Sequence, residues 1–171
     1  MKAEQAIISF NVYADSATTP LEGVSEIKLP SLQAITAELN LSGMAGKSNV
    51  ALLGQFDTLT LGVTADIASK AAIASALQGS NGLTVRAAVQ VLDTSTGARI
   101  TQNRTYFMRG FCNQLDLGTI KKGESMGNST EFELNYIKML VDGEDVFELD
   151  KFNMVYRVNG TDMLADVRNA I

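Results

Sequence analysis

Residues Glu131 to Val141 read EFELNYIKMLV, and polar and apolar side chains alternate through the first half of this stretch. Such a period of two is typical of a half-buried β-strand. The run stops at Asp142-Gly143, a pair that suits a tight hairpin turn because glycine tolerates positive φ and aspartate can enter the left-handed region. A return strand through Val146–Leu149 should follow. The stretch therefore predicts a β-hairpin around which the rest of the chain is organised.

The segment after this hairpin predicts a further strand and a short helix that ends the sequence. Its strand residues share one apolar face: Phe152, Met154, Tyr156 and Val158. Asn159-Gly160 ends the strand, and Asn159 or Thr161 can cap the helix. Arg168 would lie near the negative end of that helix. Its apolar stripe comprises Met163, Leu164, Val167 and Ile171.

The upstream sequence predicts more strands and one other helix. Alternation or β-rich composition marks the strands at 8–14, 24–29, 35–41, 58–64, 83–91 and 100–117. An alanine-rich helix is expected over Ile67–Gln78, with Asp66 as its N-cap and Gly79 closing it. A polar loop is expected around 121–128. The predicted class is mainly β with two short helices.

Residues 42–56 lack clear periodicity and are predicted to form an extended glycine-rich loop. Gly43, Gly46 and Gly54 punctuate a segment that also contains apolar side chains: Met44, Val50, Leu52 and Leu53. A loop of this length is uncommon within a compact domain and is usually functional. Because its apolar side chains would be costly to leave in water, the loop either folds back on its own core or is buried by another subunit.

Composition limits the possible classes of protein. The 171 residues fit a single domain, 1–171, and 46% of them are hydrophobic, which is typical of a globular chain. No stretch reaches the roughly 20 apolar residues of a membrane span, and the start, MKAEQ, does not resemble a secretory signal. The net charge of −5 argues against a sequence-independent grip on nucleic acid.

No cofactor site, metal site or enzymatic activity is expected. The chain has no histidine, which removes the usual general base and the commonest metal ligand, and its single Cys112 excludes an intramolecular disulfide. Acidic residues crowd the span 142–150, but their spacing does not match a calcium loop, and solvated acids are ordinary beside a turn. Gly43–Ser48 lacks the spacing of a phosphate-binding loop. A glycoside hydrolase using two of the carboxylates among Asp142, Glu144, Glu148 and Asp150 has little support.

The predicted strands leave a geometric problem at their edges. Unprotected edges pair with other chains, and only the strand before Pro30 has a residue that would blunt it. Neighbouring subunits could complete the sheet in a closed ring, or the sheet could close on itself as a barrel. The pattern leaves both arrangements open.

Several motifs, read in order, resemble the major tail tube protein family of contractile-tailed bacteriophages and R-type tailocins. The resemblance is densest in Val158-Asn159-Gly160, followed by Asp162, Leu164, Arg168 and Asn169. Similar motifs upstream are Leu29-Pro30-Ser31-Leu32, Gly43-Met44, Met108-Arg109-Gly110, Asp116-Leu117-Gly118, Lys122-Gly123-Glu124, Asp142-Gly143 and Glu148-Leu149-Asp150.

This resemblance implies a β-sandwich-like small barrel with one flanking helix and a short C-terminal helix. Six copies would form a ring, rings would stack into a hollow tube, and the 42–56 loop would reach into adjacent subunits. The N-terminal residues and the 121–128 loop would add ring-to-ring contacts. The implied inter-subunit contact residues are Gly43, Met44, Gly46, Val50, Leu52, Leu53, Lys121, Lys122, Glu124, Asn159, Asp162 and Arg168.

The implied partners are further copies of the chain and the other parts of the tail. The contractile sheath would lie outside, the tape-measure protein and passing DNA inside, and the baseplate and terminator at the ends. The particle would be a virion tail or tailocin assembled in the bacterial cytoplasm. Two alternatives are a tube protein of the type VI secretion kind and a monomeric β-barrel that binds a small molecule, with residues 42–56 folded over its own barrel.

Overall fold

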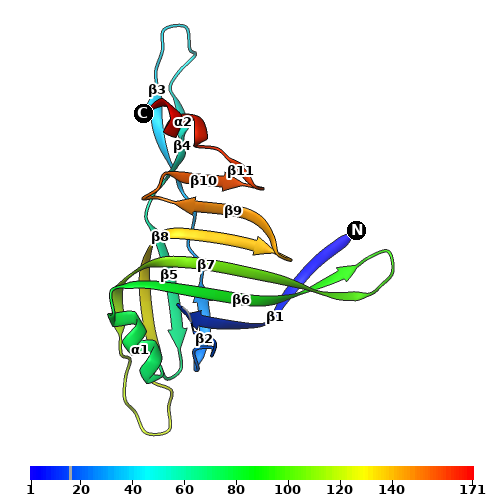
Figure 1. Cartoon of the computed structure of the whole chain (residues 1–171), viewed down its shortest axis with the longest axis vertical. Coiled ribbons are helices and arrows are strands. Elements are labelled where there is room, and N and C mark those ends of the chain that lie inside the picture. Colours follow the sequence, from blue (N-terminus) through cyan, green and yellow to red (C-terminus); the bar gives the residue numbers. More distant parts are fainter. Residues whose placement is uncertain (16) are drawn as a thin grey trace.

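The computed structural model describes residues 1–15 and 17–171 (Figure 1). The strands are β1 Lys2–Ala14, β2 Val24–Lys28, β3 Ala34–Leu39, β4 Ser48–Phe56, β5 Leu59–Ala65, β6 Ser80–Asp93, β7 Arg99–Asp116, β8 Asn128–Val141, β9 Glu144–Asp150, β10 Val155–Val158 and β11 Thr161–Asp162. The helices are α1 Lys70–Leu77 and α2 Ala165–Ala170. The predicted mainly β class, with one flanking and one C-terminal helix, is confirmed.

β8, which contains the alternating stretch 131–141, connects the two parts of the large antiparallel sheet. One edge of β8 pairs with β7 along most of its length. Its other edge pairs with β5 over residues 128–134 and with β9 over residues 136–141. The register against β7 shifts between Arg109 and Gly110, where β8 changes partner on its other edge. A bulge of this kind bends a strand, so β8 can serve both groups of strands.

The core lies between the β1–β6–β7 layer and the strands β2 and β5, which run across it (Figure 1). Leu59 and Leu61 of β5 are fully buried against Leu83 and Val85 of β6, and Ala76 brings α1 onto the same cluster. Among the described residues no ladder joins β1 to β2. An open groove of about 480 Å³ separates these two strands, so the sheet curls without closing into a barrel.

The segment predicted as an irregular loop is mostly strand. Residues 48–56 form β4, which pairs with β3 in a separate two-stranded sheet, and only residues 40–47 turn between them. The prediction was wrong because the glycines obscured the pairing: Gly43 and Gly46 lie in the turn, and Gly54 lies where the register slips. We call residues 34–56 the arm, because this ribbon projects beyond the main sheet (Figure 1).

Helix α1 begins later than predicted. Ser69, not Asp66, is its N-cap, and the Ser69 hydroxyl accepts the backbone N–H of Ala72 at 3.2 Å. Asp66 is held outside the helix because its backbone N–H donates to the Gly23 carbonyl at 2.9 Å.

The C-terminal segment also differs from its prediction in two places. Phe152 and Met154 lie in a turn rather than a strand, because the Asp150 carboxylate accepts the backbone N–H groups of Phe152 and Asn153. Neither Asn159 nor Thr161 caps α2, whose N-cap residue, Leu164, makes no side-chain capping bond. The two glycine turns are confirmed: φ is 51° at Asp142 and 48° at Asn159, each followed by a glycine at positive φ.

Candidate assembly surfaces

The arm is amphipathic and its apolar face is exposed. Ala37 lies opposite Val50, and Leu39 lies opposite Ser48, so these side chains share one face of the ribbon. Glu38 and Asn49 form the next cross-strand pair and occupy the other face, where Lys47 makes an ion pair of 2.9 Å with Glu38. Leu39 is 38% exposed and Val50 is 44% exposed. A two-stranded ribbon is at best marginally stable alone, and this apolar face is not buried by the rest of the subunit.

The arm brings together half of the predicted contact residues. Gly43, Met44 and Gly46 lie in the turn at its tip. Val50, Leu52 and Leu53 lie on β4, and all three are exposed. The arm points away from the core rather than across it (Figure 1). The monomeric-barrel alternative expected residues 42–56 to fold over their own barrel, and this expectation was wrong.

The base of the arm packs against the C-terminal segment. The Phe56 and Tyr156 rings make an edge contact with centroids 5.2 Å apart, and Gly54 lies directly against Leu164. Between the arm and α2 is a depression of about 320 Å³, which we call the base groove. Its lining residues are Ile35, Leu53, Gly54, Gln55, Phe56, Asp150, Lys151, Met154, Leu164 and Val167.

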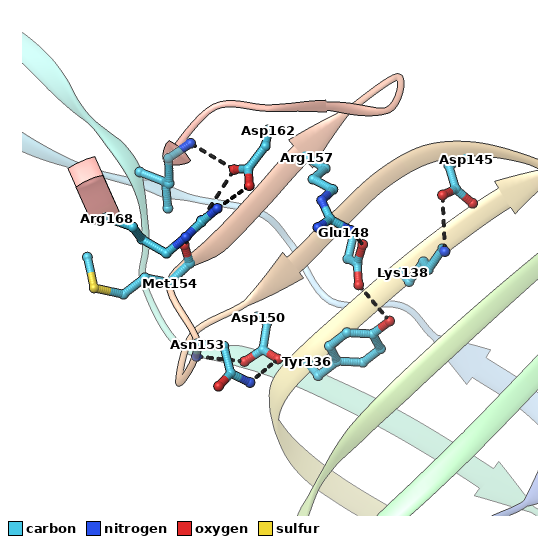
Figure 2. Close-up of polar contacts among 11 residues, drawn as sticks. Tyr136, Lys138, Asp145, Glu148, Asp150, Asn153, Met154, Arg157, Asp162 and Arg168 are labelled. Carbon is cyan, nitrogen blue, oxygen red and sulfur yellow. Dashed lines mark hydrogen bonds and ion pairs between the residues drawn. The ribbon is translucent and has the colours of Figure 1, made fainter. Parts of the chain in front are cut away.

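Ion pairs and hydrogen bonds tie the last strands and α2 together (Figure 2). Arg168 pairs with Asp162 and also donates to the Met154 carbonyl at 2.7 Å. The Arg168 hydrogen bond lowers the pKa of the Asp162 carboxyl, and the pKa of Arg168 is raised in return. These two predicted residues therefore hold α2 in place. Asn159 lies in the nearby turn, and its backbone N–H donates to the Val146 carbonyl at 2.8 Å.

The acidic residues near this network have structural partners. Glu148 pairs with Arg157 at 3.1 Å and is hydrogen-bonded to the Tyr136 hydroxyl at 3.1 Å (Figure 2). Burial, followed by the charge of Glu148, raises the pKa of Tyr136 to about 12. Asp145 pairs with Lys138 at 3.1 Å. Asp145 and Glu148, two of the carboxylates considered for a calcium site, are thus paired with basic side chains of the sheet.

The loop of residues 117–127 presents the other predicted contact residues. Lys121, Lys122 and Glu124 are exposed in it, with Lys121 and Glu124 paired at 3.4 Å. Ile120 is 86% exposed beside the two lysines. The loop lies at the end of the long axis opposite the arm (Figure 1). We call residues 119–124 the loop tip.

Asn128 fixes the base of this loop, although its sequence context did not mark it. It is 3% exposed, accepts the backbone N–H of Ala68 at 2.9 Å and donates to the Leu117 carbonyl at 2.7 Å. The Asp66 carbonyl accepts the N–H groups of Met126 and Gly127 at 3.0 and 3.1 Å. The sequence predicted that Asn128 lies in a polar loop. Nothing local could have revealed its burial, because its partner Ala68 is 60 residues away.

Within residues 1–15 and 17–171, no group of three or more histidine, cysteine or acidic side chains is placed to hold a metal ion. No helix in the described part of the chain has the length and apolar character needed to cross a bilayer. Cys112 is half-buried, and burial raises the pKa of its thiol, which disfavours the reactive thiolate.

A mainly β chain with an exposed apolar arm and acidic residues engaged in structural pairs has the features of a structural subunit. The chain belongs to the phage tail tube protein FII family, which matches residues 4–171. The description of that family is of tail tube proteins, a structural class rather than an enzymatic one.

Two individual comparisons accompany the family match. The tail tube protein of Escherichia phage P2 is 34% identical over 64 residues, which is 37% of this chain and 37% of that protein. The aligned part thus spans a little over a third of the length of this relative. A chain of the anti-feeding prophage baseplate, solved by cryo-EM, has a TM-score of 0.43 and 14% identity over 77% of this chain and 90% of that one.

Proposed function

We propose that this chain forms six-membered rings that stack into the hollow inner tube of a contractile tail. The amphipathic arm is the observation that supports this most strongly. Its apolar face, with Leu39 and Val50 exposed, lies outside the core of its own subunit. Burial of such a face against a neighbour is worth about 25 cal/mol per Å² of apolar surface, and a copy of the same chain is the partner available in a tube.

The edges of the large sheet support closure into a ring. In the part of the chain that the structure describes, β1 and β2 each pair on one side only, and β11 ends the sheet on the far side. Open edges of this kind template pairing with another chain. An edge-to-edge contact repeated around a rotation axis is heterologous and closes into a ring. Each subunit would then supply part of one continuous barrel wall.

The other parts of the tail follow from this arrangement. The sheath would cover the outside, the tape-measure protein and DNA would occupy the bore, and the baseplate and terminator would meet the ends. Assembly would take place in the cytoplasm of the bacterial host, as part of a virion or a tailocin. A type VI secretion tube shares the ring architecture and is the second candidate, but the family match favours a phage tail.

DNA would pass through the bore without specific binding. Duplex DNA carries one negative charge per about 1.7 Å, and a chain with a net charge of −5 would not hold it by counterion release. Lysine substitutions at bore-facing carboxylates should therefore slow DNA delivery. Unchanged delivery would contradict this part of the proposal.

Negative-stain electron microscopy and light scattering across a concentration series test the assembly. We expect rings of six copies or hollow tubes from the unmodified chain. Val50→Glu, on the apolar face of the arm, should remain folded by circular dichroism but fail to form either. Asn49→Glu, one residue away on the polar face, is the matched control and should assemble. A strictly monomeric chain, or normal tubes from Val50→Glu, would contradict the proposal.

A further inference from the structure

The loop tip lies at one end of the long axis, and the arm, whose base forms one wall of the base groove, projects at the other (Figure 1). The loop tip carries one strongly exposed apolar side chain, Ile120, followed directly by Lys121 and Lys122. The base groove is an apolar depression with an acidic residue in its wall. We propose that Ile120 of one copy inserts into the base groove of the next copy along the tube, with the two lysines facing acidic residues at the groove. This contact rests on the proposed stacking of rings and assigns specific residues to it.

The base groove has room for an apolar side chain and leaves its walls open to solvent. Its volume is about 320 Å³. Four of its apolar lining residues are from 37% to 52% exposed: Ile35, Leu53, Met154 and Val167. Such a cluster resembles the apolar pockets that receive a central anchor at protein interfaces. Ile120 is an isolated anchor of matching character.

The net charges of the two surfaces differ in sign: the loop tip has Lys121 and Lys122 against Glu124, and the groove has Asp150 and Asp166 against Lys151. Asp150 lines the base groove, and Asp166 is exposed in the first turn of α2, which carries the lining residue Val167. Lys151 keeps its positive charge in the groove wall, where its ammonium group donates to the Asp57 carbonyl at 2.7 Å. Opposite charges at the rim of a contact favour one orientation and faster encounter more than raw affinity. The lysines would thus set the register while Ile120 supplies the buried surface.

The base of the loop is rigid enough to present Ile120 in one position. The Thr119 N–H donates to the Met126 carbonyl at 2.9 Å, which closes the loop below its tip. A Cβ atom at Gly118 would clash with the same carbonyl oxygen, so the two sides of the loop are in direct contact. Asn128 fixes the adjoining segment through its bonds to Ala68 and Leu117. A pre-organised element loses less conformational entropy on binding.

Disulfide trapping between copies tests the contact directly. In a Cys112→Ser background, a chain carrying both Ile120→Cys and Val167→Cys should form a ladder of covalent oligomers after mild oxidation of assembled tubes. Mixing the two single-cysteine variants should give covalent dimers only, because each copy then has one reactive end. Ile120→Cys combined with Ala98→Cys, an exposed position in the β6–β7 turn, is the control and should give no ladder.

A charge exchange provides a second measurement. Lys121→Glu with Lys122→Glu should raise the concentration at which tubes begin to form by about tenfold. Adding Asp166→Lys to the same chain should lower that concentration part of the way back to its original value. Tubes that form normally but give no ladder would overturn this contact and leave the tube function intact. A chain that stays monomeric and unlinked at every concentration would overturn both proposals.

Discussion

Gly54 and Leu164 are in such close contact that a Cβ atom at Gly54 would lie 2.7 Å from Cδ1 of Leu164. Gly54 belongs to β4, whereas Leu164 is a buried residue just before α2. The contact therefore joins the arm to the end of the chain. A side chain at position 54 would have to displace Leu164.

Gly54→Ala should lower the free energy of unfolding by about 2 kcal/mol, because it adds a steric clash to the cost of a left-handed backbone. The φ of Gly54 is 66°. Urea denaturation measures the change. Gly43→Ala separates the two effects, since Gly43 also has a positive φ but a Cβ there meets nothing within 4 Å. Equal losses in the two variants would show that the contact with Leu164 is unimportant.

Asn128→Ala should destabilise the chain by about 2 kcal/mol or more, because it leaves the Ala68 N–H and the Leu117 carbonyl without their partner. Hydrogen exchange should also accelerate at Ala68 and through residues 117–127. Asn49→Ala, at an exposed position of the arm, is the comparison and should change stability by no more than about 0.5 kcal/mol. A neutral effect of Asn128→Ala would contradict the role assigned to this amide.

Tyr136 should ionise well above the ordinary pKa of a tyrosine, 10.0. Burial and the charge of Glu148 raise its pKa from 10.0 to about 12. A raised pKa means that the folded state favours the neutral phenol, so this stabilisation is present below pH 10 and is lost as the pH approaches 12. Ultraviolet absorbance of the phenolate should show a late phase that Tyr136→Phe removes. Glu148→Gln should bring that phase to lower pH.

The ion pair of Asp162 with Arg168 should weaken in acid. The Arg168 hydrogen bond lowers the pKa of Asp162 below 3.8, so the pair stabilises the folded state above that pH and is lost as the pH falls through the lowered pKa. In Arg168→Gln, the titration midpoint of the Asp162 carboxyl, followed by NMR, should move upward. An unchanged midpoint would show that Arg168 is not the main cause of the shift.

The parts of the fold that depend on local sequence were predictable. Alternation in residues 131–136 revealed β8, and Asp142-Gly143 revealed the turn into β9, because both signals lie within the elements themselves. The two helices were also predicted, but the prediction of Asp66 as the N-cap of α1 was wrong. Its bond to the Gly23 carbonyl connects positions far apart in the sequence.

The secondary-structure predictions were wrong where the structure depends on contacts between distant residues or on side-chain bonds within a turn. Alternation placed Phe152 in a strand, but the Asp150 carboxylate caps a turn there and leaves Phe152 80% exposed. The pairing of Val50 with Ala37 was hidden by neighbouring glycines. Of the predicted contact residues, the structure groups those of the arm and those of the loop tip on separate surfaces. Their roles between subunits remain predictions.

The unpartnered arm has a consequence for the ends of the proposed tube. A subunit in the wall would have its ribbon covered by a neighbour, whereas a subunit in the last ring would leave its apolar face, including Leu39 and Val50, in water. The subunits of the last ring would then associate more readily with other apolar surfaces and be less stable than subunits within the wall. A terminator could recognise the end of the tube by its uncovered arms alone. It would need no other feature that distinguishes the last ring from the rings below it.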